Sequence, residues 1–152
     1  MTLVELLQAQ SNEILKNAFE SVKRSQLKSY DKSGDEHIHQ RLKALFVLTA
    51  RAIKERNLGP MIAHAETVAN ERFAAGYDLS EVQTAFNVLE ESIWVDIVKY
   101  LPPAEYGEAL GLVSTVLGAG KDSLARRYVS LASHSKATSL NLHSIFSGTE
   151  GV

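Results

Sequence analysis

Histidines and carboxylates give this chain its widest range of possible chemistry, because they can ligate metals or move protons. Glu36 and His39 have the Glu-x-x-His spacing with which di-iron carboxylate bundles place two ligands one turn apart on a helix. Such a site needs a second pair and two more inward glutamates, which the sequence does not offer. We interpret both residues as a solvated helix start and expect no metal site.

His39 is also the candidate for phosphotransfer, because helical phosphotransfer modules carry an exposed histidine with a lysine nearby and a glycine that admits the partner. Here Lys43 stands at a different spacing, and the surrounding segment has no glycine. Nucleophilic triads and phosphate loops find no support either. No serine lies on a strand-to-helix elbow, and residues 118–121 lack the P-loop spacing. We therefore expect no enzymatic activity and no catalytic residue.

His64 borders the apolar stripe of a predicted helix and is the best-placed axial ligand for haem. A lone histidine there is more often a hydrogen-bonded boundary residue, so we expect no cofactor and keep haem as the less favoured alternative. A hairpin that turns at residue 77 would set His64 opposite Glu90, one turn before Trp94. A small-molecule pocket could then form among His64, Phe86, Glu90 and Trp94, although plain core is the favoured interpretation of Trp94.

Arg72 points close to the centre of the same apolar stripe when the helix is projected at about 100° per residue. A buried guanidinium needs an acid or several carbonyls. The hairpin register offers Glu81 or Asp78 as that acid. A clamp that holds the hairpin together is the favoured interpretation of Arg72, and an anchor for an anion or ligand is the alternative.

Composition limits the classes of protein to which the chain can belong. Its 152 residues suffice for one domain, and 45% are hydrophobic. The absence of cysteine excludes disulfides and thiol catalysis, and the net charge of −2 gives no attraction to nucleic acid or an anionic membrane. No apolar run is long enough for a membrane span, and the N-terminal segment does not resemble a signal peptide. We expect a cytoplasmic protein.

Hydrophobic periodicity predicts an all-α fold, a single-domain antiparallel bundle of about five helices with a long last helix. Capping boxes at Thr2–Glu5 and Asp78–Glu81 begin two of the helices, and Gly76 ends the one before the second box. We expect a helical domain over 1–134 and a Ser-rich flexible tail over 135–152. The predicted helices span 3 to beyond 22, 35–56, 60–75, 79–101 and 104–134, with a loop at 28–35.

The last predicted helix carries an apolar seam and, beside it, a stripe of small residues. Glycine inside a helix costs roughly 1 kcal/mol against alanine, so several on one face suggest that another backbone approaches closely. Packing within the monomer and self-association as a homodimer are both open at this point. The candidate interface residues are Gly107, Leu110, Gly111, Val113, Leu117, Gly118, Leu124 and Tyr128.

Residues 69–82 (ANERFAAGYDLSEV) and 85–91 (AFNVLEE) carry a resemblance to a known family. The segment is similar to the N-terminal domains of RsbT co-antagonist (RsbRD-type) proteins and to related input domains of bacterial histidine kinases. These share an Arg, a short spacer, a Gly, a Leu-x-Glu start and a long amphipathic helix. Only Arg72 and Gly76 match as structural signatures. Family members usually continue into a STAS or kinase domain, whereas this chain continues into its Ser-rich tail.

The resemblance implies an all-α sensory module without enzymatic activity that dimerises and passes its output through its C-terminal helix. We therefore predict a non-enzymatic regulatory domain of bacterial signalling, of the stress-response or two-component type, acting through a protein partner and as a homodimer. The alternative is a small-molecule or haem-binding helical sensor with its pocket near His64, Glu90 and Trp94.

Overall fold

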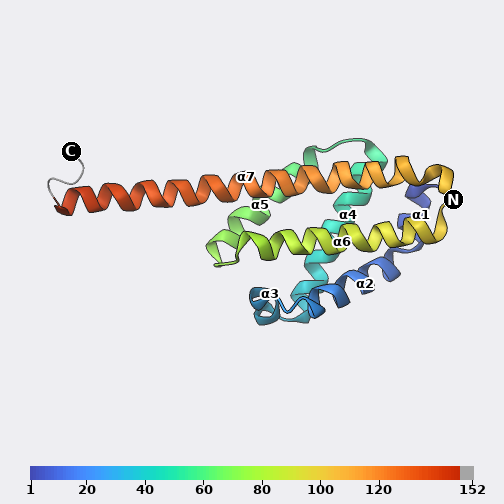
Figure 1. Cartoon of the computed structure of the whole chain (residues 1–152), viewed down its shortest axis with the longest axis horizontal. Helices are drawn as coiled ribbons and strands as arrows, with labels where there is room; N and C mark the ends of the chain where they lie inside the picture. Colours follow the sequence, from blue (N-terminus) through green and yellow to red (C-terminus); the bar gives the residue numbers. More distant parts are fainter. Residues whose placement is uncertain (148–152) are drawn as a thin grey trace.

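The computed structural model describes the backbone of residues 1–147 and the side chains of residues 1–135. Within these residues the fold is all-α, as the sequence predicts, and contains no strand (Figure 1). The elements are α1 (Leu3–Ala9), α2 (Ser11–Arg24), α3 (Lys28–Ser33), α4 (Asp35–Glu55), α5 (Gly59–Ala74), α6 (Leu79–Tyr100), the 3₁₀ turn η1 (Pro103–Glu105) and α7 (Tyr106–Ser147).

The helices do not form the simple antiparallel bundle of about five that periodicity suggests. Helices α6 and α7 run antiparallel and side by side, while α4 crosses behind them at a steep angle (Figure 1). Helix α5 lies between α4 and α7 and contacts both. The described part of the chain holds seven α-helices.

Both extra helices come from the N-terminal third of the chain. The predicted first helix is broken at Gln10, whose backbone (φ −109°, ψ 19°) leaves the helical region and separates α1 from α2. The predicted loop at 28–35 contains α3, which buries the ring of Tyr30 to 3% exposure. Gly34 then turns the chain into α4. Its φ of +92° is a conformation that residues with a Cβ rarely adopt.

The predicted core stripes are confirmed where they depend on local periodicity. On α4 the six residues that follow its 3.6-residue apolar period are buried, and the hydroxyl of Thr49 donates to the carbonyl of Leu45 at 2.7 Å. This bond satisfies the one polar member of the stripe, in the way the sequence suggests. The buried α4 residues are Ile38, Leu42, Leu45, Phe46, Thr49 and Ile53.

The start of α6 is fixed by the capping box that the sequence predicts. The Asp78 amide donates to Glu81 at 3.2 Å, and Gly76 before it has the expected positive φ of 84°. Glu81 also accepts from the backbone amide and the hydroxyl of Ser29 at 2.8 and 2.9 Å. The carboxylate therefore ties α3 to the first turn of α6.

A Glu81→Gln substitution is expected to lower the free energy of unfolding by about 1 kcal/mol at neutral pH. Burial alone would raise the pKa of Glu81, but the hydrogen bonds from Ser29 and Asp78 outweigh it and lower that pKa. The carboxylate's contribution is therefore present at neutral pH and is lost as the pH falls through its folded pKa. Urea denaturation at pH 7 and in acid measures this loss. Glu66→Gln, exposed on α5 and in no ion pair among the described residues, is the control, and equal effects of both variants would contradict the prediction.

Helix α7 packs its apolar seam against the chain's own helices, chiefly α5 and α6. Four of the candidate interface residues, Val113, Leu117, Leu124 and Tyr128, are buried there and offer no surface to a second chain. Leu110 and Gly118 are half-buried, and Gly107 and Gly111 are exposed. A Cβ at Gly107, Gly111 or Gly118 would meet no described atom of another segment within 4 Å, so no other described backbone approaches that edge.

The end of α7 differs from the expected boundary at 134. The helix continues to Ser147, because no proline or glycine lies between Lys121 and Ser147 to end it. Its C-terminal part projects beyond the other helices (Figure 1). The remainder of the predicted tail, residues 148–152, lies outside the described residues. Among the helices that are described, none has both the length and the apolar character needed to cross a bilayer.

Candidate ligand-binding site

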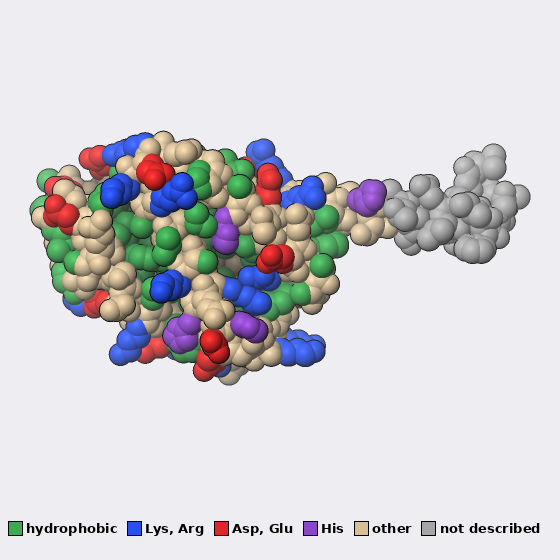
Figure 2. All heavy atoms as spheres, turned by 180° about the vertical axis from the view of Figure 1, so that it is seen from behind, with side chains coloured by type: hydrophobic (Ala, Val, Ile, Leu, Met, Phe, Trp, Pro, Cys, Tyr) green, Lys and Arg blue, Asp and Glu red, His purple; other side chains and the backbone are tan. Residues whose placement is uncertain are grey.

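A cavity of about 250 Å³ lies between α4 and α5, with α2, α3 and α6 contributing to its walls. On the face that α4 and α5 form, apolar side chains gather among basic and histidine side chains (Figure 2). Most of the cavity wall is aliphatic or aromatic, and its polar groups are concentrated on α4 and α5. Of the predicted ligand-binding residues, the cavity brings together His64, Arg72 and Phe86.

The helical period explains why α5 lines the cavity with this particular mixture. His64, Val68 and Arg72 recur every fourth residue and so share one face of α5. Arg41 comes from α4, at the edge of the apolar stripe next to Leu42. The crossing of the two helices brings the arginines, 31 positions apart in the chain, to the same end of the cavity.

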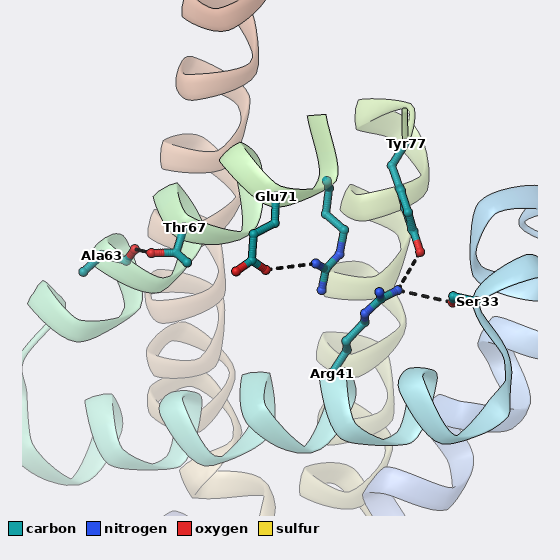
Figure 3. A network of polar contacts seen from close by, with 7 residues as sticks. Ser33, Arg41, Ala63, Thr67, Glu71 and Tyr77 are labelled. Atoms are coloured by element: carbon teal, nitrogen blue, oxygen red, sulfur yellow. Dashed lines mark hydrogen bonds and ion pairs between the residues drawn. The ribbon is translucent and has the colours of Figure 1, made fainter. Parts of the chain in front are cut away.

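Both guanidinium groups lie against the ring of Tyr77, in the turn before α6. The guanidinium carbon is 5.4 Å from the ring centroid for Arg41 and 5.7 Å for Arg72. Arg41 Nη1 donates to the Tyr77 hydroxyl at 2.7 Å and to the Ser33 hydroxyl at 3.3 Å, an arrangement drawn in Figure 3. Both partners of Arg41 are neutral, so these hydrogen bonds leave its charge uncompensated.

Arg72 is deeply buried and only partly paired. Its side chain is 11% exposed, and Nη1 lies 3.2 Å from a carboxylate oxygen of Glu71, which is itself 63% exposed. Arg72 Nε is buried and has no hydrogen-bond partner among the described residues. The predicted clamp to Glu81 or Asp78 is wrong, because the capping box and Ser29 occupy Glu81.

The predicted contact between His64 and Glu90 is also wrong. Glu90 is 6% exposed and faces α7, where Lys121 Nζ lies 3.4 Å from its carboxylate. His64 instead faces the cavity beside α4, and burial, followed by the charge of Arg72, lowers its pKa. Trp94 is 40% exposed and lines no part of the cavity, so it is neither core nor pocket wall.

The electrostatics of the cavity favour negative charge. Burial raises the pKa of Tyr30, and the nearby charges of Arg72 and Arg41 oppose that rise. Two guanidinium groups and one well-exposed carboxylate leave a surplus of positive charge at this end. Among the described residues, no group of three or more His, Asp or Glu is placed to hold a metal ion. The arrangement suits a compact molecule rather than an ion alone.

Sequence reasoning missed three contributors to this end of the cavity: Tyr30, Arg41 and Glu71. Tyr30 was hidden in a segment that looked like a loop. The position of Arg41 directly beside the apolar stripe of α4 was the available signal, since a charged residue there must reach a partner or a cavity. Glu71 is the sequence neighbour of Arg72, and neighbours on a helix normally point apart.

Neither a protein-family model, nor a curated protein, nor a solved structure matches the chain. The fold and the site define the class of protein: an all-α domain with an apolar-walled cavity that is basic at one end.

Proposed function

We propose that the chain is a non-enzymatic sensory domain that binds a small molecule between α4 and α5 and passes the response to a regulatory protein partner. The observation that carries the proposal is Arg72, which lines the cavity, bonds to Glu71 through Nη1 and has a buried Nε with no partner among the described residues. Folded proteins rarely leave a buried donor unsatisfied, and a ligand is one way to satisfy it. The signalling part of the proposal rests on the resemblance of residues 69–82 and 85–91 to RsbRD-type domains.

A route from the cavity to the molecule's longest helix supports a sensory role. The turn before α6 carries Tyr77, whose hydroxyl accepts from Arg41 and whose carbonyl accepts from the Tyr128 hydroxyl on α7 at 3.1 Å. The ring of Tyr128 also makes an edge-to-face contact with Phe73 on α5. A shift of the arginines on ligand binding would therefore reach α7 through groups already in contact.

Ligand retention tests the proposal directly. Native mass spectrometry of the freshly purified full chain is expected to show a small-molecule adduct that denaturation removes. Ala85→Leu, which adds bulk to the cavity wall, should abolish the adduct, whereas Ala74→Leu on the exposed face of α5 should retain it. A bare chain, together with no thermal stabilisation by any fraction of a metabolite extract, would contradict the proposal.

A second copy of the chain is the partner that we propose for the outer face of α6. Trp94, Val95 and Val98 are 40%, 54% and 54% exposed there. Glu91, one turn before Val95, has no ion pair among the described residues, and Lys99 stands one turn after it. Antiparallel pairing of two α6 helices about Val95 would bring each Glu91 towards the other chain's Lys99, which now pairs with Glu13.

Analytical ultracentrifugation measures this association. The wild-type chain is expected to sediment as a dimer at micromolar concentration, and Val98→Asp as a monomer, because the new charge would be buried without a partner. Val47→Asp places the same charge on an equally exposed valine of α4 and should leave the dimer intact. A monomeric wild type would refute the homodimer and leave the ligand-binding proposal standing.

A further inference from the structure

We propose that the ligand of the α4–α5 cavity is a compact carboxylate, with an apolar body among α4, α5 and α6 and its acidic group held by Arg72 and Arg41. This inference rests on the proposed function and adds the chemical class of the ligand.

The unfilled hydrogen-bonding capacity of Arg72 defines the acidic end. A guanidinium offers five N–H donors in one plane, and Glu71 is hydrogen-bonded to Nη1 alone. Arg72 lines the cavity, and its buried Nε has no partner among the described residues. A carboxylate is an acceptor that matches this planar fork, and it supplies the charge that a buried guanidinium requires.

The charge of Arg41 makes a ligand with a single negative charge the best match for this end of the cavity. Its hydrogen bonds go to the hydroxyls of Tyr77 and Ser33, so no acid among the described residues pairs with it. Together with Arg72 and Glu71 it gives this end of the cavity a formal charge of about +1, which one carboxylate would cancel. An amine would be repelled. A phosphate would bring a second charge and more polar surface than the wall accommodates.

The rest of the wall defines the apolar body. Val68, Val82, Ala85 and Phe86 are each 8% exposed or less and present carbon atoms to the cavity. The volume of about 250 Å³ lies at the small end of ligand sites, so a compact ring or short chain fits, and a lipid with two chains does not. His64, whose pKa is lowered by burial, adds a neutral polar group to the α5 side.

Three probes with one body and different head groups test the inference by isothermal titration calorimetry on the full chain. These are 4-phenylbutyrate, 4-phenylbutanol and 4-phenylbutylamine. The acid is expected to bind roughly 10- to 100-fold more tightly than the alcohol, the range that charged hydrogen bonds supply. The amine is expected to show no binding. An alcohol that binds as tightly as the acid would overturn the carboxylate assignment.

Substitutions at the acidic end locate the effect. Arg72→Gln should bring the affinities for acid and alcohol close together, and Arg41→Gln should weaken acid binding alone. Arg51→Gln, exposed on α4 and paired with Glu55, is the control that should change neither affinity. Glu71→Gln should strengthen acid binding, because it removes the negative charge that competes for Arg72. Equal effects of Arg41→Gln and Arg51→Gln would contradict the inference, and this comparison decides even if Arg72→Gln fails to fold.

The outcomes separate this inference from the proposed function. Binding of the alcohol as tightly as the acid, abolished by Ala85→Leu, would show a functional cavity with no preference for carboxylates, and only the inference would fail. Absence of binding by all three probes refutes the inference. The proposed function falls as well only if the freshly purified chain also retains no ligand and no extract fraction stabilises it.

Discussion

Replacing Gly120 by alanine is expected to destabilise the protein by about 1–2 kcal/mol, although alanine is the better helix former. A Cβ at Gly120 would lie 2.9 Å from both Met61 Sδ and Phe86 Cε2, closer than real Cβ atoms approach. Met61 is 0% and Phe86 3% exposed, so both side chains would have to shift within the packed interior, Phe86 towards the cavity that it lines. The overpacking cost therefore exceeds the gain of roughly 1 kcal/mol in helix propensity.

Gly111→Ala is the matched comparison, because it makes the same chemical change on the same helix. Nothing lies within 4 Å of a Cβ at Gly111, so only the propensity gain remains. This variant is expected to be more stable than the wild type by about 0.5–1 kcal/mol. Urea denaturation of the two variants and the wild type gives the comparison. A loss of stability in Gly111→Ala would show that the α7 edge is covered in solution.

Asp96→Asn is expected to stabilise the protein at pH 8 and to have little effect near pH 4. Asp96 is 1% exposed, and neither carboxylate oxygen has a hydrogen-bond partner in the part of the chain that the structure describes. Burial, followed by the neighbouring Glu13 of α2, raises the pKa of Asp96 to about 6. Lys99 opposes this rise, but its ammonium group pairs with Glu13 at 2.8 Å, and the Tyr100 hydroxyl donates to the same carboxylate at 3.0 Å.

The direction of the pH dependence follows from the raised pKa of Asp96. The unfolded chain releases this proton near pH 3.9, whereas the folded chain holds it until about pH 6. The contribution of protonated Asp96 to the stability of the wild-type protein is therefore present at low pH. It falls as the pH rises from about 4 to 6 and is absent above that range. Asparagine remains neutral throughout and can donate to Glu13.

The expected gain for Asp96→Asn at pH 8 is about 1–2 kcal/mol. This gain is smaller than the free energy that the full pKa shift of Asp96 would give, because solvent near Glu13 screens the charges. Chemical denaturation of both proteins at pH 4, 6 and 8 measures the difference. Asp122→Asn, on the exposed surface of α7, is the control and should show no such trend. A difference between Asp96→Asn and wild type that stays constant with pH would refute the prediction.

The parts of the fold that the sequence predicts are those encoded by near neighbours in the chain. The capping boxes at Thr2 and Asp78, the positive φ of Gly76 and the buried stripe of α4 each depend on residues within a few turns. Helix α3 escaped prediction because a single aromatic ring, that of Tyr30, holds a short polar segment in place. Propensity alone does not stabilise a six-residue helix.

The site was predictable in residue type but not in pairing. Arg72 was identified as a buried cation that needs a partner, and His64 and Phe86 do line the cavity. The partners were wrong because they depend on how helices cross. The position of α7, not the hairpin register, pairs Glu90 with Lys121. The crossing of α4 likewise brings Arg41 to Arg72, and no local pattern encodes that angle.

The contacts of Tyr77 have a mechanical consequence. Its side chain is bonded to α4 and its backbone carbonyl to α7, so displacement of the arginine-bearing face would pull directly on the long helix. The 42 residues of α7 form a rod about 60 Å long. Tyr128 lies about 33 Å from the start of this rod, so a tilt about that start would move the far tip about twice as far as it moves Tyr128, which makes α7 a lever.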